Sequence, residues 1–144
     1  MRLELTRRGD YAIRAMLSIA ANDGQQPISV RRIAEAMAIP APILPQVMRH
    51  LVRAGLVAAQ TGRAGGYRLG RPADEISLLA VIEAIEGDTR RRTCVLRGGP
   101  CSRDGHCAVH EVFFLAQEAV RNELGRATLG DVIASNDGVV LRLS

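Results

Sequence analysis

Two short helix patterns followed by a glycine-rich hairpin constrain the fold of this chain more than any other feature. The first helix begins after Ser29, whose hydroxyl can cap it, and the second is predicted over residues 42–54. Pro42 and Pro45 are compatible with the second helix because proline is tolerated in a first turn. This pair of helices predicts a helix-turn-helix motif.

Two short strands are predicted directly after these helices, over residues 56–59 and 67–69. The intervening stretch, residues 60–66, is rich in glycine, which is typical of a hairpin tip. A strand-turn-strand unit behind a helix-turn-helix is the pattern of a winged helix. In that fold the helix over residues 42–54 would be the one that reads DNA.

Further helix patterns lie on both sides of this motif. A first helix is predicted over residues 6–21, another from Ser77 to Gly87, and a long one over residues 108–124. Thr128 with Asp131 three residues later forms a capping box that starts a short terminal helix. The predicted fold class is therefore mainly α with a small β wing, a winged helix-turn-helix domain plus a long C-terminal dimerisation helix.

Four segments follow from this order of elements. Residues 1–72 form the winged helix-turn-helix DNA-binding domain, 73–87 a connecting helix, 88–107 a cysteine loop, and 108–144 the dimerisation helix and C-terminal helix. The apolar stripe of the long helix exceeds what one small winged domain can cover, so a partner helix is its natural cover. The chain is accordingly expected to form a homodimer.

The charge is divided unevenly along the chain. All 19 basic residues are arginine, and the net charge is +4. Residues 1–71 hold 11 arginines against four acidic residues, net +7, whereas residues 72–144 hold eight against 11, net −3. A basic first half favours a polyanion partner. No apolar run approaches the roughly 20 residues of a membrane span, and charged residues occupy the start of the chain, so a cytoplasmic protein without a membrane partner is expected.

Polar side chains of the helix-turn-helix and the wing are the candidate contacts to double-stranded DNA. Glutamine suits adenine and arginine suits guanine in the major groove, whereas arginines of the preceding helix more naturally meet phosphates. An arginine between glycines at the hairpin tip can reach a minor groove. The alternative is an ordinary solvated helix face. The candidates are Arg31, Arg32, Gln46, Arg49, His50, Arg53 and Arg63.

Three cysteines form the second candidate site. Six residues separate Cys94 from Cys101, five separate Cys101 from Cys107, and two separate Cys107 from His110. Structural zinc usually has tighter Cys-x-x-Cys spacing, so this loose spacing favours an iron-sulfur cluster. Three thiolates leave one ligand to be supplied, and His110 lies one helical turn beyond Cys107. A zinc site and bare thiol sensing are the alternatives.

Several motifs together resemble the IscR/NsrR/RirA family of bacterial transcription regulators. They are Met1-Arg2-Leu3, Asp10-Tyr11-Ala12, the wing Gly62 to Leu69, the turn Ile82 to Gly87, and the cysteines before a long helix. The resemblance implies a homodimeric winged-helix protein whose cysteine loop holds an iron-sulfur cluster that senses iron, cluster supply, nitric oxide or redox state. It also implies binding to a DNA operator, which for a two-fold dimer would be palindromic.

The resemblance bears on the cluster ligands. It implies a 2Fe-2S cluster held by the three cysteines and His110, although this chain has one extra residue between Cys94 and Cys101. Asp10 is the rival fourth ligand, because its position matches a carboxylate that completes a 4Fe-4S cluster across the dimer in NsrR-like members. An ion pair between Asp10 and Arg14 explains the same aspartate without a metal.

Other function classes find little support in the sequence. No Cys-x-x-Cys pair, no nucleophile with an evident base and no glycine-rich phosphate loop after a strand is present, so an enzyme is not expected. A cluster-binding protein that does not bind DNA is a further alternative. The favoured hypothesis is a regulator in which the loop between Gly87 and Cys107 sets the spacing of the two reading helices.

Overall fold

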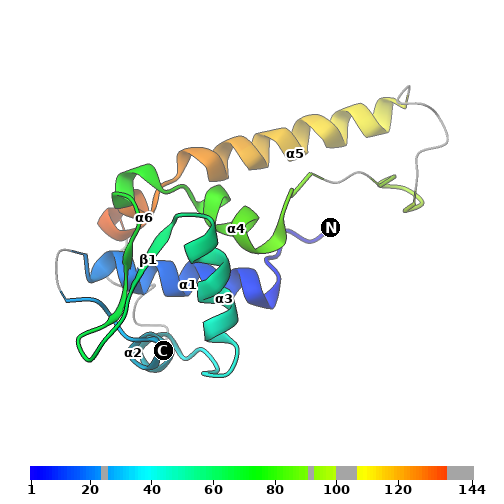
Figure 1. Ribbon diagram of the computed structural model, residues 1–144. Helices are drawn as coiled ribbons and strands as arrows, with labels where there is room; N and C mark the ends of the chain where they lie inside the picture. The colour runs from blue at the N-terminus through cyan, green and yellow to red at the C-terminus, as the bar shows by residue number, and fades with distance from the viewer. Residues whose placement is uncertain (24–25, 91–92, 100–106, 136–144) are drawn as a thin grey trace.

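A computed structural model of the chain describes residues 1–23, 26–90, 93–99 and 107–135 (Figure 1). No helix in these ranges has the length and hydropathy that a membrane crossing requires. The elements in chain order are α1 (Arg7–Ala21), α2 (Val30–Met37), α3 (Leu44–Arg53), β1 (Val57–Gln60), β2 (Gly66–Leu69), the 3-10 turn η1 (Ala73–Glu75), α4 (Leu78–Glu86), α5 (Ala108–Arg126) and α6 (Leu129–Ser135).

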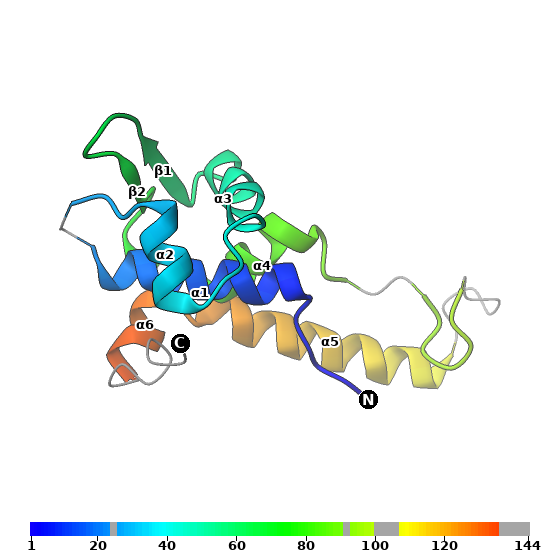
Figure 2. The ribbon, with the colours of Figure 1, turned by 90° about the horizontal axis from the view of Figure 1, so that it is seen from below.

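Helix α1 is the centre of the domain. The Thr6 hydroxyl accepts a hydrogen bond from the Gly9 amide and so begins the helix, as an N-cap should. Most of the helix is buried, and it contacts α2, α3, α4, α6 and β2. Figures 1 and 2 both place α1 between α2 on one side and α5 on the other. The predicted first helix is confirmed.

The helix-turn-helix is formed by α2 and α3, and α3 starts two residues later than predicted. Residues 41–43 form a turn, and the helix begins at Leu44. A start at Pro42 would have placed Pro45 at the fourth helical position, where the first backbone N–H is needed as a donor. With the later start, Pro45 lies at a position that needs no N–H.

The wing is an antiparallel pair in which Val57 faces Leu69 and Gln60 faces Gly66. Each strand gains one residue at the tip relative to the prediction. A side chain at Gly66 would meet the Ile28 carbonyl oxygen, because Ile28 and Tyr67 bond to each other through both backbone groups at 3.1 and 2.8 Å. Close backbone approach therefore requires glycine here.

The C-terminal part of the chain divides between the domain and a projecting arm. Leu129 of α6 is fully buried in the core, and the Leu129 amide donates to the Ile76 carbonyl at 2.9 Å. By contrast, no residue of α5 is fully buried, and its N-terminal half extends away from the domain (Figure 1). The Thr128–Asp131 capping box is confirmed by reciprocal hydrogen bonds of 3.0 and 3.1 Å. Residues 136–144 lie outside the described residues.

We expect Ala38→Gly to stabilise the fold. Ala38 ends α2 with φ 52° and ψ 44°, and it is the one non-glycine residue in the described part of the chain with a positive φ. Glycine adopts this left-handed conformation without steric strain, whereas alanine does not. We expect the strain removed to exceed the entropic cost of ordering glycine, so that the free energy of unfolding rises by about 0.5–1 kcal/mol. Urea unfolding measures the change. Ala36→Gly, within the same helix, should lower stability, and equal losses in both variants would contradict the explanation.

Candidate nucleic-acid interface and sensor loop

Helix α3 presents a polar face to solvent and an apolar face to the core. Its buried face consists of Leu44, Val47, Met48 and Leu51. Gln46, Arg49 and Arg53 are exposed, and His50 is half-buried. The helix periodicity thus separates the predicted reading residues from the core. The two arginines have no ion pair with any described residue, so their guanidinium groups are available to a ligand.

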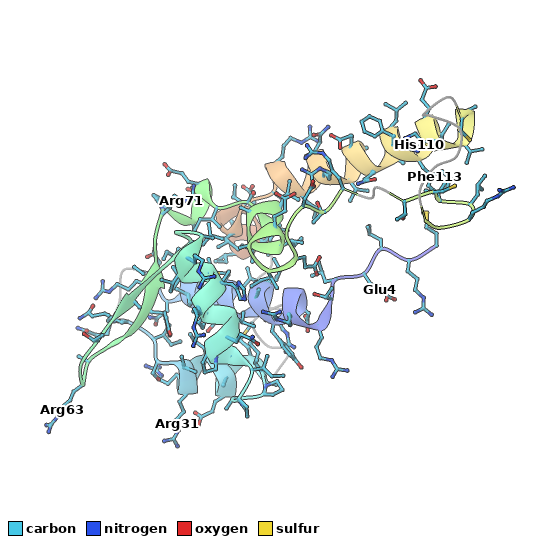
Figure 3. All side chains as sticks on the ribbon, turned by 45° about the vertical axis from the view of Figure 1, so that its right-hand side comes forward. Glu4, Arg31, Arg63, Arg71, His110 and Phe113 are labelled. Atoms are coloured by element: carbon cyan, nitrogen blue, oxygen red, sulfur yellow. The ribbon has the colours of Figure 1, made fainter. Side chains whose placement is uncertain are left out.

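Helix α2 and the wing extend this surface. Arg31 and Arg32 are exposed on α2, where Arg31 donates to Glu35 at 3.0 Å. This pair is solvent-exposed and therefore weak, so it leaves Arg31 accessible to phosphate. Arg63 is exposed at the tip of the hairpin, and Figure 3 shows Arg31 and Arg63 projecting at the same end of the molecule.

Arg14 links α1 to the end of α2, the first helix of the helix-turn-helix. Its guanidinium donates to both carboxylate oxygens of Asp10, at 3.2 and 2.8 Å, and to the Met37 carbonyl oxygen at the end of α2. The ring of Tyr11 lies 5.2 Å from the guanidinium carbon. The ion pair predicted for Asp10 and Arg14 is confirmed, and the Asp10 side chain remains 49% exposed.

The two cysteines that the structure describes, Cys94 and Cys107, lie near the N-terminal end of α5, which extends away from the domain. Cys107 is the N-cap residue of α5, which is where the sequence placed the helix start, and His110 follows in the first turn. Cys94 lies in a turn whose backbone bonds join it to Gly98 and Gly99, at 2.8 and 2.9 Å. Both cysteines are half-buried, and Cys101 lies outside the described residues.

His110 borders a cavity of about 430 Å³ beside the cysteine loop. The walls come from the N-terminal segment, α4, α5 and the loop, and Thr93 and Val95, the neighbours of Cys94, line it too. His110 and the Cys94 turn therefore border one space. Asp10 does not line it. In Figure 3 His110 and Phe113 lie at the opposite end of the molecule from Arg63. No group of three metal-ligating side chains occurs within the described residues.

A cluster of charged residues fastens the start of the cysteine loop to α5. Arg121 donates to Glu83 at 2.6 Å and also to the Thr89 hydroxyl, and its side chain is only 11% exposed. This hydrogen bond lowers the pKa of Glu83 and raises that of Arg121, because it favours the charged form of each. Gln117 adds a bond to the Thr89 carbonyl at 3.3 Å.

Arg90 extends this charged cluster at the start of the cysteine loop. Its side chain lies 3.7 Å from Asp88 and 3.5 Å from Glu118, so it belongs to this charged cluster. Both carboxylates compensate its charge. This charged cluster was not predicted. The sequence does contain a signal for it, because Arg121 lies between the apolar residues Val120 and Leu124 of the long helix, where a charged side chain needs a partner.

Glu86 joins the end of α4 to the start of α1. It accepts hydrogen bonds from the Thr6 amide, at 2.9 Å, and from the Thr6 hydroxyl. A side chain at Gly9 would collide with the Glu86 carboxylate, so the glycine makes room for it. A carboxylate at a helix N-terminus is also favoured by the helix dipole. The sequence motif containing Glu86 was noted, but this contact was not predicted.

The architecture and the residues described above agree with a known protein family over most of the chain. Residues 5–135 match Rrf2, whose description is "Iron-dependent Transcriptional regulator". The chain belongs to the Rrf2 family. Its relatives include the HTH-type transcriptional regulator IscR of Vibrio parahaemolyticus, which is 33% identical over 142 residues, 99% of this chain and 83% of the relative.

Solved Rrf2-type structures have the same fold. CymR (YrzC), the global cysteine regulator of B. subtilis, has a TM-score of 0.81 and 28% identity, covering 94% of this chain and all of that one. IscR of T. potens has a TM-score of 0.74 and 27% identity, covering 92% and 87%. The predicted regulator family and the winged-helix fold are confirmed. The protein is a transcriptional regulator of the Rrf2 type.

Proposed function

We propose that this Rrf2 regulator is a homodimer that reads a palindromic operator and senses its signal through an iron-sulfur cluster held by Cys94, Cys101 and Cys107. The observation that carries this proposal is the position of Cys107 and His110 on one helical turn, beside the cavity that the Cys94 turn also borders. Thiolates with imidazole are a known ligand set for 2Fe-2S clusters. The donor chemistry therefore fits.

His110 is our proposed fourth ligand. Asp10, the rival, already forms a two-pronged bond with Arg14, which also supports the end of α2. Recruiting Asp10 to a 4Fe-4S cluster of the partner subunit would cost that ion pair and loosen the helix-turn-helix. Among the described residues, His110 forms no ion pair that would have to break. Its binding to a cluster would therefore cost less free energy than the binding of Asp10.

Homodimerisation is supported by the apolar surface of α5. Val109, Val112, Phe113, Phe114 and Leu115 are all exposed on the arm that extends from the domain. Monomeric proteins rarely expose a contiguous apolar patch of this kind, and a two-fold partner would cover it. A two-fold dimer would also present two copies of α3, one to each half-site of a palindromic DNA sequence.

The regulatory mechanism we propose is a population shift of the cysteine loop. When bound, the cluster supplies a centre that responds to iron supply, nitric oxide or redox state. Near the start of the loop, Arg121 binds both Thr89 and Glu83 of α4. The same helix ends at Glu86, which accepts a hydrogen bond from Thr6, the N-cap of α1. Ordering the loop would therefore bias α1, and through Arg14 the end of α2.

Anaerobic purification followed by absorbance, iron and sulfide assays and native mass spectrometry tests the cluster. We expect a coloured protein with iron and sulfide, which Cys101→Ser and Cys107→Ser lose. His110→Ala should change the cluster spectrum, whereas Asp10→Ala should not. Operator affinity of Cys101→Ser should differ from that of the parent under anaerobic conditions, and equal affinity and sequence preference would refute control by the cluster.

A thiol-based regulator is the second candidate, favoured by the structural likeness to CymR, the cysteine regulator. The same purification separates the two. A colourless protein whose cysteines oxidise reversibly, with a matching change in DNA affinity, would favour thiol sensing. A colourless protein with one zinc per chain would favour a zinc site. Either result rules out the cluster.

Base-reading and phosphate-binding arginines should respond differently to substitution. We propose that Gln46, Arg49, His50 and Arg53 read bases, that Arg31 and Arg32 bind phosphates, and that Arg63 enters a minor groove. Arg49→Ala should weaken binding to the preferred site by about 1–3 kcal/mol and relax its sequence preference. Arg32→Ala should weaken binding to all duplexes alike and reduce the salt dependence.

Fluorescence anisotropy over a salt series, with preferred and scrambled duplexes, measures both effects. The two variants serve as controls for each other because both remove one exposed arginine from the helix-turn-helix. Identical losses on the preferred and the scrambled duplex for Arg49→Ala would contradict its role in base reading.

A further inference from the structure

The N-terminal end of α3 is exposed yet apolar. Ala41, Pro42 and Pro45 are exposed, and the N-cap Ile43 offers no side-chain hydrogen bond to the helix. None of these four side chains carries a donor or an acceptor. The exposed prolines do not belong to the buried face of α3, so packing of the core does not explain them.

Pro45 shares a face of α3 with two of the exposed arginines. Pro45, Arg49 and Arg53 are separated by steps of four residues, so their side chains follow one side of α3, and Pro42 lies in the turn directly before the helix. The face therefore changes along its length, from apolar at the N-terminal end to cationic at the C-terminal end. The cations match a DNA backbone in charge.

In a helix-turn-helix the N-terminal residues of the second helix reach the base edges. An apolar side chain at the N-terminal end of α3 can contact one apolar group on the major-groove edges of the bases, the C5 methyl of thymine. The remaining groups there are hydrogen-bond donors and acceptors, which proline cannot satisfy and would desolvate at a cost.

We propose that Pro42 and Pro45 are specificity-determining residues that select thymine through its methyl group. The proline rings are rigid, so contact with a methyl group freezes no side-chain rotation. Pro45 also occupies a helical position that needs no N–H, so the helix accepts it without loss. This inference rests on the proposed DNA-reading role of α3 and adds the chemistry that it reads.

Methyl deletion in the DNA tests the inference directly. The purified protein first selects its preferred site from a random duplex library, and each thymine of that site is then replaced by deoxyuridine, which lacks only the methyl group. At one or two positions in each half-site we expect binding to weaken roughly fourfold per methyl. Replacing such a T·A pair by 5-methylcytosine·G should bind more tightly than unmethylated C·G, because the methyl group is restored.

Two protein variants complete the experiment. The double variant Pro42→Ser/Pro45→Ser should bind the thymine and deoxyuridine duplexes alike, while Pro72→Ser, an exposed proline outside the reading helix, should keep the parent's discrimination. Circular dichroism checks that both variants fold. Site-specific binding that is unaffected by every deoxyuridine substitution would overturn this inference alone. Absence of salt-dependent duplex binding by the parent would overturn the DNA-reading proposal as well.

Discussion

Val112→Asp is expected to convert the proposed dimer into a monomer and to weaken operator binding by at least about 100-fold, because the second copy of α3 would no longer bind intramolecularly. Val112 is 65% exposed on α5, in the middle of the apolar surface that the proposed partner would cover. A carboxylate there would be buried in the interface without a partner, which strongly disfavours association.

Analytical ultracentrifugation gives the mass in solution, and fluorescence anisotropy with a palindromic duplex gives the affinity. Asn122→Asp is the matched control, since it adds the same charge at an exposed polar position of α5 and should remain dimeric. A parent protein that sediments as a monomer at micromolar concentration would refute the proposed dimer. A dimeric Val112→Asp variant would show that the interface lies elsewhere.

Arg121→Met is expected to cost about 2 kcal/mol of stability at neutral pH. Removing one partner of a fully buried pair costs roughly 3–5 kcal/mol. The Arg121 side chain is 11% exposed but that of Glu83 is 33% exposed, so water screens part of the loss. The methionine keeps much of the packing, and the main loss is the bond to Glu83 and Thr89.

The same pair predicts a pH dependence. Because Arg121 lowers the pKa of Glu83 in the folded protein, the pair contributes its full stability above the ordinary glutamate pKa of about 4.3 and loses it as the pH falls through the lowered value. The stability difference between parent and Arg121→Met should therefore shrink in acid.

Urea unfolding at pH 7 and below pH 4 measures both effects. Arg126→Met is the control, because Arg126 pairs with Glu123 on the exposed side of α5 and should contribute little. Equal unfolding midpoints for parent and Arg121→Met at pH 7 would contradict a structural role for this pair. A difference that does not change with pH would contradict the role of Glu83.

Local signals in the sequence predicted the individual elements well. The Ser29 hydroxyl accepts the expected backbone hydrogen bond, as do the N-cap hydroxyls of Thr6 and Ser77, and Thr128 with Asp131 forms its box. These interactions join residues three positions apart, so a short stretch of sequence contains both partners. The predicted start of α3 was wrong by two residues, because Pro45 has no N–H to donate at the fourth position of a helix that begins at Pro42.

Contacts between distant residues were not predicted. Glu86 meets Thr6 across 80 positions, and Arg121 meets Glu83 across 38. Each of these side chains has many candidate partners of opposite charge or polarity, and only the packing of α4 against α1 and α5 selects among them. The candidate reading residues were easier to identify, because helix periodicity alone separates them from the core.

The sequence by itself determined the helix-turn-helix, the wing, the exposed basic face of α3 and the family, because periodicity, caps, glycines and motifs act over a few residues. Only the tertiary structure decided that α6 completes the core through Leu129, that α5 projects with its apolar side chains uncovered, and that Arg121 pairs with Glu83. The physical reason is that burial and ion pairing depend on which elements meet, and that choice is made by the whole chain.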